Sequence, residues 1–296
     1  MKHGFIKTIK TQSKLKLVVR GGGSMRSVIN RAFIITTALL IVLIPASSIL
    51  VSAAPAFTEY PVPVSGIPYA TTGITAGPDG ALWFVYDDLN STVGHIGRIT
   101  TTGVITTYQV PTSQPELSGI TAGPDGALWF TEGRSDKIGR ITTSGNITEY
   151  SLPPGTASSS LGPYPLAITA GPDGALWFTE EYGDRIGRIT TSGEISEYAL
   201  PIVGVYPFDI TPGPDGALWF TEYSSTRIGR ITTSGSITQF STGCSESPYS
   251  CGAEGITTGP DGALWFTAQK ANKIGRITTA GVASFYAHTS GTVLIT

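Results

Sequence analysis

Between residues 55 and 296, hydrophobic and polar positions alternate in short runs separated by turn residues, a pattern typical of β-strands. A short apolar run such as Ala167–Thr169 leads into a Gly-Pro-Asp-Gly turn, in which proline presets φ and glycine adopts the left-handed conformation. The next run, Ala-Leu-Trp-Phe-Thr-Glu, is apolar on both faces, which indicates a strand packed between neighbouring sheets. A third strand, Lys-Ile-Gly-Arg-Ile-Thr, and a fourth, such as Ile147–Tyr150, complete a four-stranded unit.

This four-stranded unit repeats along the chain. The octapeptide Gly-Pro-Asp-Gly-Ala-Leu-Trp-Phe occurs five times without variation, at intervals of 46, 48, 42 and 46 residues, and contains every tryptophan of the chain: Trp83, Trp129, Trp177, Trp219 and Trp265. Four strands in such a period are typical of a propeller blade, whereas a β-helix repeats at shorter spacing. The sequence therefore predicts an all-β protein, a β-propeller of four-stranded blades with five complete repeats. We expect the repeated Trp, Phe and Arg side chains to be structural.

Both ends of the repeat region resemble parts of further blades. Phe57–Tyr60 matches a lone fourth strand and Thr292–Thr296 a first strand, which brings the expected total to 22 strands. Closed rings of such blades need a multiple of four strands, and an open ring exposes edges that β-proteins avoid. We therefore expect residues 55–296 to form a propeller with partial blades, truncated at its C-terminus.

Residues 1–54 differ in composition from the repeats and indicate an export signal. Eight Lys or Arg and no carboxylate lie in residues 1–53, and the uncharged, mostly apolar run Ala32–Ile44 is followed by small residues up to Ala54. We expect cleavage after Ala53 and a natural start at Met25, which opens a compact signal by itself. An uncleaved membrane anchor is the alternative, which Pro45 disfavours. The predicted location is secreted or at the cell surface.

Charge excludes one class of partner. After residue 53, 11 basic residues face 21 acidic ones, so the body of the protein carries about -10. Proteins that bind nucleic acid need clustered cations, and an acidic body repels phosphate. We expect a monomer with a small-molecule or protein ligand, which contacts membranes only through the signal segment if that segment stays uncleaved.

The two cysteines, Cys244 and Cys251, bracket a short polar loop. In an oxidising compartment such a pair is expected to form a disulfide. Without nearby histidines the two thiols make a poor zinc site. The predicted bond is a structural staple.

The repeat resembles the streptogramin B lyases, also called virginiamycin B lyases. The resemblance rests on Gly-Ile-Thr-x-Gly-Pro-Asp-Gly-Ala-Leu-Trp-Phe-Thr-Glu followed by Lys-Ile-Gly-Arg-Ile-Thr-Thr-Ser-Gly-x-Ile-Thr-Glu-Tyr, and it covers Ala56 to Tyr286. It implies a seven-bladed propeller and a magnesium-dependent lyase that inactivates cyclic depsipeptide antibiotics by opening their ester through elimination. That reaction needs a base for the proton α to the carbonyl and a cation for the developing enolate.

The resemblance implies working histidines directly before the Ala-Ile-Thr or Gly-Ile-Thr strand of late blades, with glutamates near the same mouth. No histidine stands in this column, which holds Thr72, Ser118, Leu166, Phe208 and Glu254. Glu116 occupies the column of a family glutamate two residues ahead, but Ser118 replaces the accompanying histidine, so no role is carried over. The resemblance places these histidines in the last two blades, which the expected truncation removes, so their absence can follow from truncation. The chain as given is not expected to be an efficient lyase.

Three equivalent glutamates, Glu132, Glu180 and Glu222, end the second strands of consecutive repeats. If they converge at one mouth, they can hold a hard cation such as Mg²⁺, the cofactor that the resemblance implies. The alternative, which we favour, is that they are repeat residues paired with arginine or backbone.

Two classes of function remain open. The first is a lyase acting on a cyclic depsipeptide. The second is a non-catalytic, exported binding propeller, whose ligand surface is predicted at Tyr164, Tyr206 and Tyr249 in the segments that cross between repeats. These tyrosines can equally cover the rim. A sugar-lactone hydrolase is a weaker third reading, since no convergent set of metal ligands marks it.

Overall fold

The computed structural model describes residues 58–62, 68–88, 93–154, 162–244 and 251–287. These residues belong to one compact unit, Thr58–Thr296. The predicted export signal at residues 1–54 and the predicted strand at residues 292–296 lie outside the described residues. In the described part of the chain, no helix is long and apolar enough to cross a membrane.

The described strands form five antiparallel sheets of four strands each. The first contains β1 (Pro68–Ala76), β2 (Leu82–Asp88), β3 (Val93–Ile99) and β4 (Ile105–Ser113). The second contains β5 (Leu117–Ala122), β6 (Leu128–Glu132), β7 (Lys137–Ile141) and β8 (Ile147–Ser151). The third contains β9 (Pro165–Ala170), β10 (Leu176–Glu180), β11 (Arg185–Ile189) and β12 (Ile195–Ala199).

The fourth sheet contains β13 (Pro207–Pro212), β14 (Leu218–Glu222), β15 (Arg227–Ile231) and β16 (Ile237–Ser241). The fifth contains β17 (Ala253–Thr258), β18 (Leu264–Ala268), the short helix η1 (Gln269–Ala271), β19 (Lys273–Ile277) and β20 (Ala283–Ala287). In every sheet the strands pair in chain order. The five sheets are numbered blades 1 to 5 below.

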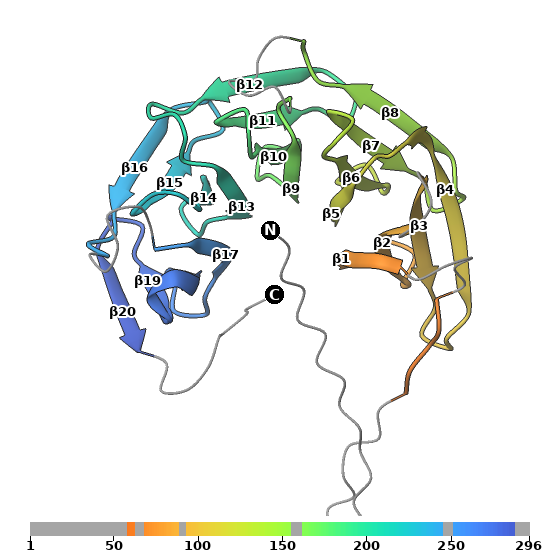
Figure 1. Ribbon diagram of the computed structural model, residues 1–296, viewed down its shortest axis with the longest axis horizontal. Coiled ribbons are helices and arrows are strands. Elements are labelled where there is room, and N and C mark those ends of the chain that lie inside the picture. The colour runs from red at the N-terminus through yellow and green to blue at the C-terminus, as the bar shows by residue number, and fades with distance from the viewer. Residues whose placement is uncertain (1–57, 63–67, 89–92, 155–161, 245–250, 288–296) are drawn as a thin grey trace, which may run out of the picture. The chain divides into compact units, whose positions relative to one another are not determined.

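Consecutive blades pack side by side. The first strands, β1, β5, β9, β13 and β17, contact one another in that order and face the centre in Figure 1, while the fourth strands lie outside. The predicted β-propeller of four-stranded blades with five complete repeats is thus confirmed. Thr58–Tyr60, predicted to be part of a fourth strand, lies beside blade 1 without forming a strand among the described residues.

The Gly-Pro-Asp-Gly turn of each repeat is bonded to both the second and the third strand of its blade. In blade 2, Asp125 accepts a hydrogen bond from the indole N–H of Trp129 (3.0 Å) and one from Nε of Arg140 (2.7 Å). The Arg140 guanidinium also lies 5.9 Å from the Trp129 ring centroid. The same Asp–Trp and Asp–Arg bonds occur in all five blades, so the repeated arginines bind carboxylates of their own blade.

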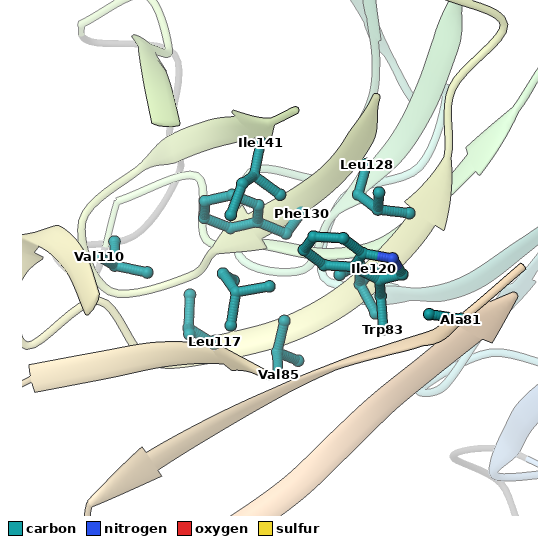
Figure 2. Packing of buried hydrophobic residues seen from close by; sticks show 10 residues of the cluster. Ala81, Trp83, Val85, Val110, Leu117, Ile120, Leu128, Phe130 and Ile141 are labelled. Carbon is teal, nitrogen blue, oxygen red and sulfur yellow. The ribbon is translucent and has the colours of Figure 1, made fainter. Parts of the chain in front are cut away.

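Blades 1 to 4 each contribute a tryptophan to the interface with the following blade. Trp83 of blade 1 belongs to one buried cluster with Ile120, Leu128 and Ile141 of blade 2, as Figure 2 shows. Trp83, Trp129, Trp177 and Trp219 are fully buried. The apolar faces of the second strands are therefore buried between blades, as the sequence pattern predicts.

Candidate functional site

The segments that cross between blades are bonded to the loops joining second and third strands, so both lie at the same edge of the propeller. The backbone N–H of Gly133 donates to the carbonyl of Glu116 at 3.0 Å, and that of Glu181 donates to Tyr164 at 3.0 Å. Equivalent bonds of the same length join Tyr223 to Tyr206 and Gln269 to Gly252. Each crossing segment is thereby fixed to the blade that it enters.

Four equivalent residues of these crossings have left-handed backbone: Glu116 (φ 52°), Tyr164 (φ 57°), Tyr206 (φ 53°) and Gly252 (φ 59°). Left-handed backbone is rare for residues other than glycine and costs about 1–2 kcal/mol. Such strain gathers at functional sites. In three blades it presents a carboxylate or a tyrosine two residues before the column in which the resemblance implies histidine, called the histidine column below.

The presented side chains meet in what we call the tyrosine–glutamate cluster: Glu116, Tyr164, Glu181, Tyr182 and Tyr206. The rings of Tyr164 and Tyr182 lie 5.0 Å apart and tilted, and Tyr206 contacts Tyr182 edge-on at 6.0 Å. The cluster thus spans the crossings into blades 2, 3 and 4. All five side chains are at least partly exposed, so their polar ends can meet a ligand.

Two carboxylates shape the electrostatics of this cluster. Burial and a hydrogen bond to Glu116 raise the pKa of the Tyr164 hydroxyl, so it remains a donor. Burial and the negative charge of Glu116 raise the pKa of Glu181, against a hydrogen bond from Tyr182. The cluster therefore combines aromatic surface with two acceptors, an arrangement suited to a ligand with apolar groups and N–H donors.

A second set of groups lies at the same edge in blades 4 and 5. The rings of Phe208 and Tyr223 are 5.9 Å apart, and Nζ of Lys270 lies 4.3 Å from the Tyr223 ring centroid. Burial raises the pKa of Glu254, while Lys270 opposes the shift. Phe208 and Glu254 occupy the histidine column. Phe208 lies beside the Tyr223 ring, and Glu254 lies near the positive charge of Lys270.

The structure brings together two of the three tyrosines predicted to line a ligand surface. Tyr164 and Tyr206 both contact Tyr182, whereas Tyr249 lies outside the described residues. Sequence reasoning missed Glu181 and Tyr182. The signal that could have found them is the loop after the second strand, which reads Gly-Arg, Glu-Tyr, Tyr-Ser and Gln-Lys in blades 2 to 5 while the strands hardly vary.

The three equivalent glutamates do not come together. Glu132, Glu180 and Glu222 are each fully buried within their own blades. Glu222 accepts hydrogen bonds from Ser225 (2.7 Å) and Gln239 (2.6 Å) of blade 4. The carboxylate oxygens of Glu132 and Glu180 have no hydrogen-bond partner among the described residues.

Burial and nearby charges shift the pKa of two of these glutamates. Burial raises the pKa of Glu132 to about 7, with Glu149 as the largest nearby charge. Burial raises the pKa of Glu180 to about 8, with Glu197 acting in the same direction. Glu149 and Glu197 lie on the outer strands of the same blades, so each glutamate extends along its own sheet and not toward a shared mouth.

These three glutamates form no shared carboxylate site in the part of the chain that the structure describes. Among the described residues, no group of three or more His, Cys, Asp or Glu side chains could hold a metal ion. Burial raises the pKa of both Glu132 and Glu180, and a hard cation binds the ionised carboxylate. The residues at hand do not fit the ion that the resemblance implies.

Cys244 and Cys251 form a disulfide in the segment that crosses from blade 4 into blade 5. Cys251 is buried, and its backbone N–H donates to the carbonyl of Ser225 at 3.2 Å. The bond thus anchors the crossing that carries Gly252 and Glu254 to the rim of blade 4.

Comparison with known proteins identifies relatives of this fold and sequence. The sequence model of the virginiamycin B lyase family matches residues 49–162 and 157–293. A selenomethionine-substituted virginiamycin B lyase from Staphylococcus aureus is 45% identical, over 75% of this chain and 70% of that one, with a TM-score of 0.66. No curated protein matches the sequence.

Two further crystal structures agree with this result. A catalytically inactive histidine-to-alanine variant of the Staphylococcus aureus lyase, solved with quinupristin, is 44% identical over 75% of this chain and 71% of that one, with a TM-score of 0.67. A streptogramin B lyase is 39% identical over 77% of this chain and 72% of that one, also with a TM-score of 0.67. The chain belongs to the virginiamycin B lyase family.

Proposed function

We propose that this protein binds cyclic depsipeptides of the streptogramin B class over the tyrosine–glutamate cluster, and that binding by the 296-residue chain is not followed by efficient elimination. The observation that carries the proposal is the cluster itself, in which Tyr164, Tyr182 and Tyr206 contact one another at the edge that presents the histidine column. Similarity to a lyase solved with quinupristin supports the class of ligand.

The chemistry of the cluster suits such a ligand. A cyclic depsipeptide combines apolar side chains with amide N–H groups and carbonyls on a constrained ring. Tyrosine rings give large apolar contact at low entropic cost, and their hydroxyls reach the polar groups. Glu116 and Glu181 add acceptors for N–H donors, and their charges disfavour an anionic ligand.

Elimination requires more than binding. A base must remove the proton α to a carbonyl, after which the ester C–O bond breaks, a carboxylate leaves and a carbon–carbon double bond remains. A related lyase is inactive when a histidine is replaced by alanine. Here the histidine column holds Thr72, Ser118, Leu166, Phe208 and Glu254, so no imidazole base is supplied at these positions. Magnesium enters the proposal only as a condition to be tested.

We also propose that the protein acts outside the cytoplasm. The basic, apolar and small-residue pattern of residues 1–54 supports export. The Cys244–Cys251 disulfide supports an oxidising compartment, since such bonds are rare where thiols are kept reduced. An exported member of the family that binds an antibiotic at the cell surface would lower the local concentration of free antibiotic without degrading it.

Calorimetric titration with quinupristin tests the binding proposal. Tyr182→Ala removes the ring that joins Tyr164 to Tyr206, and we expect it to weaken binding about tenfold or more. Tyr182→Phe keeps the ring and should retain most of the affinity. Ser144→Ala, in an exposed turn of blade 2, serves as the remote control.

Two outcomes would overturn the proposal. Wild-type protein that shows no heat and no gain in melting temperature with quinupristin would instead favour a propeller that binds a protein ligand. Equal affinities of wild type and a folded Tyr182→Ala variant would move the site away from the cluster. Repeating the titration with magnesium and with a chelator shows whether binding needs the ion.

A further inference from the structure

Three of the crossing segments are held by aspartates of the blade that they leave. In the crossing into blade 4, the Asp184 carboxylate accepts the backbone N–H groups of Gly204 (2.7 Å) and Val205 (3.0 Å) through separate oxygens, and that of Tyr206 at 3.3 Å. Asp184 is only 4% exposed, so these hydrogen bonds are shielded from water. One buried side chain of blade 3 thus fixes three successive residues of this crossing.

Asp136 and Asp87 make the same kind of contact in the two preceding crossings. Asp136 of blade 2 accepts the backbone N–H of Tyr164 at 3.0 Å. Asp87, near the end of β2 in blade 1, accepts the backbone N–H of Leu117 at 2.9 Å, and Leu117 directly follows Glu116. Each cluster residue with left-handed backbone is therefore held at its own N–H or at that of the next residue.

These aspartates accompany the side chains of the tyrosine–glutamate cluster and are not a general feature of the repeat. Asp136 and Asp184 directly precede the third strands of blades 2 and 3, and the same position of blade 4 holds Thr226. The crossing that leaves blade 4 has Gly252 at the left-handed position. That crossing is tied by its disulfide and by the backbone bond from Cys251 to blade 4. An aspartate thus occurs where the crossing presents a tyrosine.

The left-handed backbone gives these hydrogen bonds a task. This conformation is unfavourable for tyrosine, so a crossing without an anchor would tend to leave it. A carboxylate that accepts backbone N–H groups favours one conformation of the segment, and hydrogen bonds to a charged group are the stronger kind. The N–H of Tyr182 donates to the carbonyl of Pro163 at 3.2 Å, so the central ring of the cluster is bonded to the crossing that Asp136 holds.

We propose that Asp136 and Asp184 are positioning residues, which hold Tyr164 and Tyr206 so that both rings meet Tyr182 and preform the ligand surface. They act through the backbone of the crossings and do not touch the ligand. A preformed surface binds more tightly, because fewer groups lose conformational freedom on binding. The gain in affinity rests on the proposed function, whereas the ordering of the crossings does not.

Amide hydrogen exchange, followed by NMR on the full chain without ligand, tests the positioning role. Asp184→Gly removes the acceptor and still allows the left-handed backbone of this position (φ 49°). It should make the amides of Val205 and Tyr206 exchange about tenfold faster, while the amides of β14 keep their protection. Asp184→Asn keeps one carbonyl oxygen and should give an intermediate rate.

Calorimetric titration with quinupristin measures the consequence for binding. Asp184→Gly should weaken binding about tenfold, and Asp184→Asn should weaken it less. Thr221→Val is the matched control, because it removes another hydrogen bond between blades, from the Thr221 hydroxyl to the carbonyl of Glu254 (2.6 Å). Blade 1 carries valine at the equivalent position, Val85. The control should lower the melting temperature without changing the affinity or the exchange of the Tyr206 amide.

The outcomes distinguish this role from the proposed function. Unchanged exchange of Val205 and Tyr206 in a folded Asp184→Gly variant would overturn the positioning role, whatever the ligand does. Equally fast exchange in Thr221→Val would also overturn it, because Asp184 would then act only through global stability. Faster exchange with full affinity would show that the ordered crossing does not preform the surface. Faster exchange in Asp184→Gly alone, when wild type does not bind quinupristin, would support the positioning role and overturn the proposed function.

Discussion

At the residue scale, the aspartate of the repeat turn stabilises its blade through two partners. Burial alone would raise the pKa of Asp125, but hydrogen bonds from Trp129 and Arg140 outweigh burial and lower it. The indole N–H of Trp129 lies in a fully buried side chain, so Asp125 satisfies a donor that has lost its water. The ion pair with Arg140 lies nearer the surface and contributes less.

Replacing this aspartate should therefore be costly where the tryptophan is buried. Asp125→Ala leaves the Trp129 N–H without its acceptor, and we expect a loss of about 1–2 kcal/mol in the free energy of unfolding by urea. Asp261→Ala is the matched control, because it breaks the same bond to Trp265, which is partly exposed and can bind water instead. Equal losses in the two variants would contradict the argument.

The buried glutamates predict a pH dependence of stability. Burial, assisted by Glu197, raises the pKa of Glu180 to about 8, against an ordinary value of 4.5 in the unfolded chain. Between these values the unfolded state releases a proton that the folded state keeps, so stability is fully present below the lower value and falls as pH rises toward 8. Glu180→Gln should remove this fall and be more stable than wild type at pH 8, on the order of 2 kcal/mol.

Unfolding of both proteins by urea between pH 5 and pH 8 measures this effect. Glu222→Gln is a useful comparison, since the Glu222 carboxylate is held by Ser225 and Gln239. Its substitution should change the pH dependence less. A Glu180→Gln variant whose stability falls with pH as steeply as that of wild type would show that Glu180 is not the group responsible.

At the element scale, the crossings between blades differ more than the blades themselves and carry the candidate site. The second strands β6, β10 and β14 have the same sequence, whereas the crossings that follow their sheets vary in length and composition. A rigid sheet on each side fixes both ends of a crossing, so its side chains can be specialised without loss of the fold. This division explains why Glu116, Tyr164 and Tyr206 take equivalent places with different chemistry.

The disulfide should act on one such crossing. Cys244 and Cys251 are seven positions apart, and closing a loop of this size should stabilise the fold by about 2–3 kcal/mol. The double variant Cys244→Ala/Cys251→Ala should melt earlier than wild type, and a reductant should lower the melting temperature of wild type alone. If wild type and the double variant melt together without reductant, the bond does not stabilise the crossing.

At the scale of the whole molecule, the repeat made the fold predictable. Each copy carries its own turn, its Trp and its Arg, so the blade containing Trp129 could be inferred without its neighbours. The contact between Glu116, Tyr164 and Tyr182 could not be inferred from the sequence. These side chains belong to different blades and meet only because the crossing segments bring them together.

The sequence repeat does not predict whether the three equivalent glutamates converge. Glu132, Glu180 and Glu222 occupy equivalent positions, and such positions in neighbouring blades can either converge on the axis or stay apart. Their sequence spacing does not distinguish these outcomes. The structure separates them, because each side chain lies next to a residue of the outer strand of its own blade or accepts hydrogen bonds there.

We propose that this member of the virginiamycin B lyase family binds a streptogramin B ligand and releases it unchanged. The most direct measurement incubates the purified protein with quinupristin and magnesium and follows the antibiotic by chromatography and mass spectrometry. We predict that the cyclic compound persists, without a linear isomer of equal mass and without a product heavier by one water. Accumulation of the linear isomer at a rate comparable to that of the Staphylococcus aureus lyase would refute this prediction, because the histidine column of this chain contains no histidine.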